Sequence, residues 1–79
     1  MSKISKLNGK QFVVIGEFKN YTTKEISKKI ESLGGEIREA VTGATHLVIA
    51  GEEPGFKVIV AQGLDVEVID EAEAGKRFF

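Results

Sequence analysis

Lys57 is the residue whose type and position most suggest binding chemistry, because it falls in the first turn of a predicted helix. Helix N-termini carry unpaired backbone N–H groups and a partial positive charge, so they favour anions. Apolar segments that end at Gly16 and Gly51 are predicted strands, and a helix is predicted after each. Both helices would start beside the same crevice, which makes this edge a candidate anion site.

The elements that would position this site form two β-α units, followed by one more strand and helix. Strands are predicted over residues 12–15, 37–41, 47–50 and 66–69. The first and third are continuous apolar runs and should be central, whereas the other two are interrupted by charged residues. Right-handed crossovers then predict an α/β fold with a four-stranded parallel sheet of order 2-1-3-4, flanked by about three helices. Ligands bind beyond the carboxyl ends of such strands, where the strand order reverses.

The first helix, from about residue 22, has the clearest local signals. Thr22 and Glu25 fit a capping box. Gly34 is expected to end the helix in a left-handed conformation, and Gly35 to let the chain pass closely into the second strand. The predicted core consists of nine apolar residues: Phe12, Val14, Ile26, Ile30, Leu33, Leu47, Ile49, Ile59 and Val68.

The second and third helices are predicted from weaker signals. The second follows Pro54, starts at Gly55 and ends near Gly63, with its buried side formed by Phe56, Ile59 and Val60. The third begins around Asp70, which is a good N-cap residue.

Other site chemistry has little support. Residues 51–57 lack the spacing and the Lys-Ser/Thr ending of a nucleotide-hydrolysing phosphate loop, and Lys19 and Asn20 stand where a dinucleotide fingerprint needs glycine. His46 has no cysteine partner, and its place at the start of a central strand favours a structural, hydrogen-bonded histidine over a general base. The carboxylates of residues 52–53 and 70–73 are better explained by loop exposure and helix capping than by acid pairs or metal binding. We expect no catalysis, cofactor or metal.

Composition is ordinary for one small α/β domain over residues 1–79, with its core at about 7–74. Hydrophobic residues make up 42% of the chain and charged residues 29%, and there is no cysteine. The absence of cysteine excludes disulfides and suits an intracellular setting. No window has the length of a signal peptide's apolar region or of a membrane span, so a soluble domain without a membrane partner is expected.

The net charge of −1 does not indicate nucleic acid, but the charge is unevenly distributed. Residues 1–40 hold eight basic and five acidic side chains, and residues 41–79 hold three and seven. The basic half is either a solvated surface or a weak DNA-facing one. Its lysines are Lys3, Lys6, Lys10, Lys19, Lys24, Lys28 and Lys29, of which Lys10, Lys19, Lys24 and Lys28 are the candidate DNA-facing residues.

The chain also resembles a known family through four segments in register: GKQFVVIG, IESLGGEI, ATHLVIAG and PGFKVIVAQGLDVEVIDEAEA. These are similar to BRCT domains over about residues 7–74, and their spacing is most similar to the BRCT domains of bacterial-type NAD-dependent DNA ligases. The family's last helix usually presents a tryptophan or another large aromatic to the core. This chain has Ala74 near that place, and Phe78 or Phe79 could compensate.

The resemblance implies a non-catalytic binding module of DNA replication or repair. In phosphate-binding BRCT domains, the positions that match Gly16 and Lys57 contact the phosphate, and a Ser or Thr hydroxyl that also contacts it is replaced here by Ile15. The expected partner is DNA, particularly a 5′-phosphorylated end or a nick, and the alternative is a phosphopeptide or protein-protein scaffold. The expected location is the cytoplasm or nucleoid of a bacterium, or the nucleus of a eukaryote.

Overall fold

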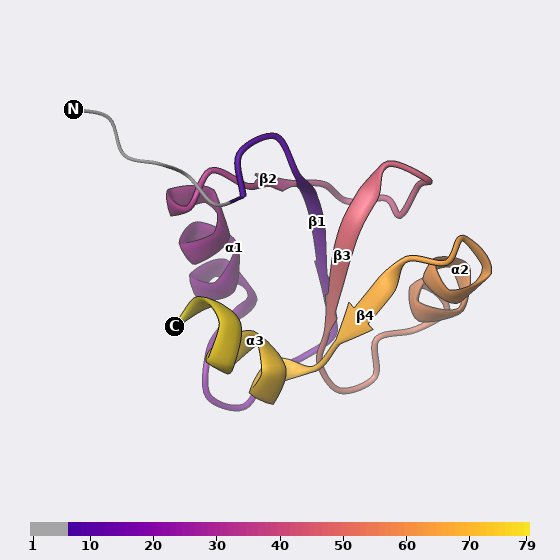
Figure 1. The fold of residues 1–79 in the computed structure, drawn as a ribbon. Helices are drawn as coiled ribbons and strands as arrows, with labels where there is room; N and C mark the ends of the chain where they lie inside the picture. Colours follow the sequence, from indigo (N-terminus) through magenta and orange to yellow (C-terminus); the bar gives the residue numbers. More distant parts are fainter. Residues whose placement is uncertain (1–6) are drawn as a thin grey trace.

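A computed structural model describes residues 7–79, and its central feature is a parallel sheet of the predicted strand order. The strands run side by side as β2-β1-β3-β4, with β1 and β3 in the middle (Figure 1). The elements are β1 (Gln11–Ile15), α1 (Thr23–Ser32), β2 (Glu36–Ile37), β3 (Thr45–Ala50), α2 (Lys57–Gly63), β4 (Glu67–Ile69) and α3 (Glu71–Phe78). The predicted α/β class and topology are therefore confirmed.

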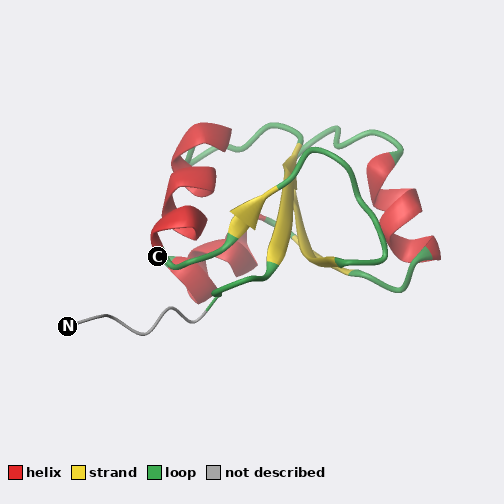
Figure 2. Ribbon diagram, turned by 90° about the horizontal axis from the view of Figure 1, so that it is seen from above, coloured by secondary structure: helices red, strands yellow, loops and turns green. Residues whose placement is uncertain are grey.

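The sheet is covered unequally on its two faces. Helices α1 and α3 lie on one face, and α2 lies alone on the other (Figure 2). Alternate residues of β1 serve the two sides: Phe12 packs beneath α1 and α3, whereas Val13 packs against Ala61 of α2. Because the central strands have helices on both sides, they can be apolar at every position, as their sequences are.

Helix α1 begins and ends as its sequence predicts. The Thr22 hydroxyl accepts from the Glu25 N–H at 3.0 Å, and the Glu25 carboxylate accepts from the Thr22 N–H at 2.8 Å. Gly34 has a φ of +96°, which is the left-handed conformation that ends the helix. A Cβ on Gly35 would lie 2.6 Å from Ile30 Cγ2, so only glycine lets the chain turn into β2 this closely.

Most of the predicted core is confirmed. Five of the nine residues are fully buried: Phe12, Ile26, Ile30, Leu47 and Ile49. Val14, Leu33 and Val68 are partly buried and pack against the buried clusters. The prediction for Ile59 is wrong.

The predicted face of α2 is wrong because the helix is rotated relative to the expected stripe. Phe56 and Ile59 are 71% and 68% exposed, and Val60 is partly buried. Ala61 is the fully buried residue of α2 and contacts the sheet between Val13 and Val48. The helix starts at Lys57, two residues later than predicted, and Phe56 stands at the N-cap without a side-chain hydrogen bond.

Strand β2 is shorter than predicted. It covers Glu36 and Ile37, whereas the sequence predicts residues 37–41. The Arg38 N–H still donates to the Phe12 carbonyl at 2.8 Å, and beyond that bond the chain leaves the sheet. Only short pairing is needed here, because β2 is an edge strand.

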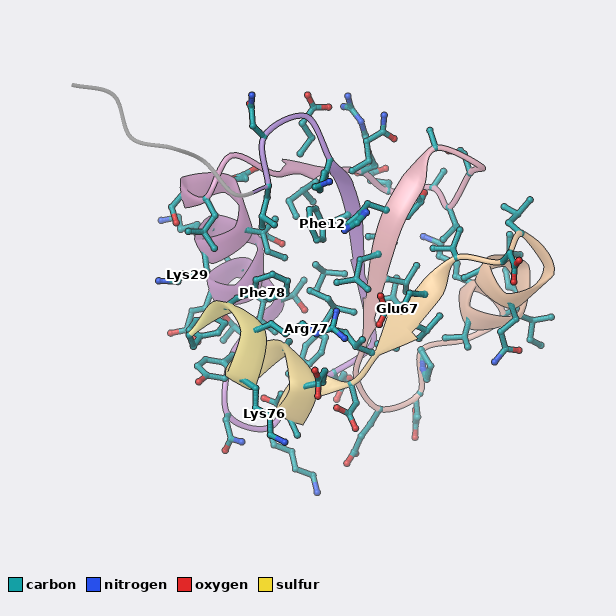
Figure 3. All side chains as sticks on the ribbon, in the orientation of Figure 1. Phe12, Lys29, Glu67, Lys76, Arg77 and Phe78 are labelled. Atoms are coloured by element: carbon teal, nitrogen blue, oxygen red, sulfur yellow. The ribbon has the colours of Figure 1, made fainter. Side chains whose placement is uncertain are left out.

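The C-terminal helix α3 supplies the aromatic that position 74 lacks. Asp70 caps the helix by accepting from the Glu73 N–H at 2.9 Å, as predicted, and Ala74 is fully buried. The Phe78 ring packs edge-on against Phe12, with centroids 6.0 Å apart. Both side chains are labelled in Figure 3. Phe79 instead stacks on Tyr21 near the surface, with centroids 4.1 Å apart. Phe78 is therefore the residue that compensates in the core.

Arg77 ties α3 to the sheet. Its guanidinium donates to Glu73 at 2.8 Å, one turn earlier, and to Glu67 of β4 at 2.9 Å (Figure 3). These hydrogen bonds, first the one with Glu67, raise the pKa of Arg77 above its ordinary value. No helix within residues 7–79 has the length and apolar character needed to cross a membrane.

Candidate functional site

The carboxyl ends of β1 and β3 are joined by a small antiparallel bridge. The Glu17 N–H donates to the Glu52 carbonyl at 3.0 Å, and the Glu52 N–H donates to the Glu17 carbonyl at 2.7 Å. This approach requires glycine on both strands: a Cβ on Gly16 would lie 2.8 Å from the Glu52 carbonyl, and one on Gly51 would overlap the Glu17 carbonyl. Gly16 also has a φ of +87°. The two glycines thus mark the strand ends and let the loops meet.

Lys57 lies at the first position of α2 and is partly buried. Its ammonium donates a 2.8 Å hydrogen bond to the Glu39 carbonyl, just beyond the end of β2. The partner is a neutral backbone oxygen, and no carboxylate of residues 7–79 lies within ion-pair distance of this lysine. The Lys57 ammonium therefore contacts the segment that follows β2 and has no acidic partner within residues 7–79.

Gly16 follows β1 and Lys57 is the first residue of α2, but the structure does not join them. Within residues 7–79, no hydrogen bond links the two, and neither lines the cavity of about 230 Å³ at this edge. Ile15, which stands where the resemblance leads us to expect a hydroxyl residue, packs with Val13 on the α2 side.

The cavity at this edge is mainly acidic. Its walls come from the loops after β1 and β3 and from the start of α3, and they include Glu17, Lys19, Glu52, Asp70 and Glu71. The Lys19 ammonium is 3.3 Å from the Glu52 carboxylate, and both side chains are largely exposed. This ion pair contributes little to the stability of the fold, since water and salt screen it.

Among the acidic residues that line this cavity, Glu71 accepts the most hydrogen bonds. It accepts from three consecutive backbone N–H groups, at 3.0 Å from Lys19, 2.6 Å from Asn20 and 3.1 Å from Tyr21. The bond from Lys19, followed by those from Asn20 and Tyr21, lowers the pKa of the Glu71 carboxyl. Sequence reasoning assigned Glu71 to helix capping and missed this role. No local signal could have found it, because the loop and Glu71 are about 50 residues apart.

The predicted basic residues are exposed but do not form one cluster. Lys24 and Lys28 share the outer face of α1, and Lys19 lies in the loop that leads into that helix. Lys10 precedes β1 and so lies at the opposite edge of the sheet. Lys29 turns toward the C-terminus, with its ammonium 5.8 Å from the centre of the Phe79 ring. Lys3 and Lys6 lie outside the described residues.

His46 lies near the start of the central strand β3, but it does not make the hydrogen bond that we predicted. It is exposed, and its ring meets the Phe12 ring edge-on at 5.6 Å between centroids. Its imidazole makes no hydrogen bond with residues 7–79. Across the same residues, no group of three or more His, Asp or Glu side chains is placed to hold a metal ion.

Comparison with known proteins decides the family. The model of the BRCA1 C Terminus (BRCT) domain matches residues 2–73. The chain belongs to the BRCT family. This BRCT domain is also similar to part of several DNA ligases, being 45% identical over 67 residues to that of Pelotomaculum thermopropionicum and 40% identical over 74 residues to that of Thermosipho africanus. The matched regions cover 85% and 94% of the BRCT domain.

The BRCT domain spans about a tenth of the length of these relatives, 10% and 11% for the two named. A third, the DNA ligase of Endomicrobium trichonymphae, is 41% identical over 69 residues, which are 87% of this chain and 10% of that protein. The sequence-based resemblance to the BRCT domains of bacterial-type DNA ligases is thus confirmed.

Proposed function

We propose that this BRCT domain is a non-catalytic binding module that works within or beside a DNA ligase and contacts DNA near a phosphorylated end or a nick. The observation that carries the proposal is the similarity of nearly the whole domain to about a tenth of each ligase. A module of this kind would act where DNA is, in the cytoplasm or nucleoid of a bacterium or in the nucleus of a eukaryote.

The proposed phosphate contacts are the backbone N–H of Gly16 and the ammonium of Lys57. Two features support this assignment. Gly16 has a left-handed conformation at the end of a central strand, and Lys57 is bonded to a neutral carbonyl that a phosphate oxygen could replace with a gain in Coulomb energy. Ile15 offers no hydroxyl, so we expect a weak site.

The proposed path for the rest of the DNA runs along α1. Lys24 and Lys28 are exposed on one face of this helix, and Lys19 precedes it. Lysines of this kind contribute to binding by releasing counterions from the phosphates, which makes affinity fall as salt rises. Lys10 lies at the other edge of the sheet and would contact DNA only if the duplex crosses both edges.

The test is fluorescence anisotropy with two nicked duplexes that differ only in a 5′-phosphate or a 5′-hydroxyl at the nick. Lys57→Ala should weaken binding to the phosphorylated duplex by roughly 1.5–3 kcal/mol, the contribution of a hydrogen bond to a charged group. It should leave binding to the hydroxyl duplex unchanged. Lys24→Ala together with Lys28→Ala should weaken both equally and reduce the salt dependence.

Lys76→Ala is the matched control, because it removes an exposed lysine of α3 outside the proposed surface. A phosphopeptide of matched length tests the alternative partner. Equal binding of wild type and Lys57→Ala to both duplexes would disprove the phosphate site. Preference for the phosphopeptide over DNA would replace the proposed partner with a phosphoprotein.

A further inference from the structure

The lateral edge of the sheet at β2 carries a hollow that the proposed phosphate contacts do not use. This hollow has a volume of about 540 Å³ and lies open to solvent. Its walls come from the start of β1, from β2 and from the segment that follows β2, and they are Gln11, Ile37, Arg38, Glu39, Ala40 and Thr42. Strand β2 is the outermost strand on this side, and no further strand of residues 7–79 pairs with it (Figure 1).

The hollow begins beside Lys57. The Lys57 ammonium donates to the carbonyl of Glu39, which is one of the wall residues, at 2.8 Å. Val41 packs with Val13 and Val48, so the segment after β2 crosses the sheet on the α2 side. A phosphate held by Lys57 would therefore stand at the rim of the hollow.

Arg38 places a second cation on the wall of the hollow. Its backbone N–H donates to the Phe12 carbonyl at 2.8 Å, while its side chain is 53% exposed. The guanidinium contacts the Glu36 carboxylate at 2.6 Å, and that side chain is also exposed. Because an exposed ion pair of this kind is weak, the guanidinium can exchange the carboxylate for a phosphate. It can also bind a phosphate through two parallel N–H bonds, which a lysine cannot do.

Lys10 adds positive charge at the amino end of the same lateral edge. It is exposed, and its carbonyl accepts from the Glu36 N–H at 2.8 Å. Gln11 pairs with Glu36 in the parallel register, so Lys10 and Arg38 are three residues, or roughly 10 Å, apart along the strands. The hollow thus has a cation at each end, Lys10 and Lys57, and Arg38 on its wall.

The charge balance separates this edge from the other two edges. Three basic and two acidic side chains border the β2 edge: Lys10, Arg38, Lys57, Glu36 and Glu39. One basic and three acidic side chains border the β4 edge: Arg77, Asp65, Glu67 and Asp70. The walls of the cavity at the carboxyl edge hold one basic and four acidic side chains. A polyanion is therefore attracted to the β2 edge more than to the other two.

We propose that this hollow receives the sugar–phosphate backbone of DNA next to the phosphate at Lys57, and that Arg38 binds an internucleotide phosphate there. The inference rests on the proposed function and adds a contact on the α2 side of the sheet, whereas the α1 lysines lie on the other side (Figure 2). The Thr42 hydroxyl accepts from the Ala44 N–H at 3.1 Å, which leaves its own proton free for a phosphate oxygen. The walls hold no aromatic ring, so they suit a backbone rather than an unstacked base.

Fluorescence anisotropy with the two nicked duplexes tests the role of Arg38. Arg38→Gln should weaken binding of the 79-residue chain to the 5′-phosphate and the 5′-hydroxyl duplex alike, by about tenfold, because an internucleotide phosphate is present in both. The slope of log affinity against log salt concentration should become shallower by about 0.9, the value for one phosphate contact. The melting temperature should not change, since the bond to Phe12 comes from the backbone.

Glu36→Gln is the converse variant. It removes the carboxylate that competes for Arg38, so it should tighten binding to both duplexes by roughly two- to fivefold, the equivalent of an exposed ion pair. Lys76→Gln is the charge-matched control for Arg38→Gln, because it removes one exposed cation of α3, far from the hollow in sequence and outside its walls.

Ala40→Phe tests the hollow itself without a change of charge. Ala40 is an exposed wall residue, so a phenyl ring there should occupy the hollow and weaken binding to both duplexes at least fivefold, with the fold intact. Ala44→Phe is the matched control, since Ala44 is exposed in the same loop but does not line the hollow.

The outcomes separate this inference from the proposed function. If Lys57→Ala weakens binding to the phosphorylated duplex but Arg38→Gln and Ala40→Phe bind like their controls, the hollow is not part of the DNA site and the inference alone is overturned. If the wild-type chain binds neither duplex, the proposed function is wrong and the inference is wrong with it. Losses at Arg38 and Ala40 that exceed those of both controls would support the inference.

Discussion

The carboxylate of Glu71, at the first position of α3, accepts a 2.6 Å hydrogen bond from the backbone N–H of Asn20 in the loop that enters α1. Neighbouring bonds from Lys19 and Tyr21 complete a three-amide nest around one carboxylate. The contact ties the last helix to the first across the carboxyl edge of the sheet.

Glu71→Gln should lower the melting temperature at pH 7, because it removes the charge that these N–H groups stabilise. The pKa of Glu71 is lowered on folding from its ordinary value of 4.5. Its contribution to stability is therefore present above about pH 4.5 and is lost as the pH falls through the lower, folded-state pKa. Melting curves between pH 7 and pH 3 should show the difference between wild type and Glu71→Gln shrinking toward acid. Glu31→Gln, an exposed change on α1, is the control.

The pair Ile30→Ala and Ile59→Ala compares one substitution on two helices. Ile30 is fully buried, so its truncation should reduce the free energy of unfolding by about 2–5 kcal/mol. Ile59 is 68% exposed, so its truncation should change that free energy by less than about 0.5 kcal/mol. Urea denaturation measures both. Equal effects of the two substitutions would show that the Ile59 side chain is buried rather than exposed.

Gly35→Ala should destabilise the fold by about 1–3 kcal/mol, because the new methyl group would lie 2.6 Å from Ile30 Cγ2 and 3.0 Å from Phe12 Cε1. Gly34→Val should be destabilising as well, through the left-handed backbone at that position. Gly43→Ala provides the comparison, since its methyl group would meet no atom within 4 Å. Thermal melts that rank Gly43→Ala with the other two would contradict the close packing at the end of α1.

Phe78→Ala should lower stability more than Phe79→Ala. Phe78 is partly buried against the core and meets Phe12, whereas Phe79 is 47% exposed and stacks on Tyr21. Phe78→Ala removes both buried apolar area and the edge-on contact with the Phe12 ring. Denaturation midpoints of the two variants give the comparison, and a larger effect at Phe79 would mean that it fills the place of the family's aromatic.

Local sequence signals predicted both ends of α1, the start of α3 and the order of the strands. The capping box of Thr22 and Glu25 and the N-cap at Asp70 depend on atoms three residues apart, so the sequence determines them without tertiary contacts. The continuous apolar character of β1 and β3 likewise required coverage on both faces, which placed both at the centre.

Only the tertiary structure decided which face of α2 is buried and which groups the site residues contact. Helix α2 has about two turns, and apolar residues surround it, so periodicity could not select the buried face; packing of Ala61 against Val13 and Val48 did. The bonds from Lys57 to the Glu39 carbonyl and from the loop before α1 to Glu71 join residues 18 and about 50 positions apart. Such contacts form only when the sheet brings strand ends together, and neither periodicity nor local capping encodes them.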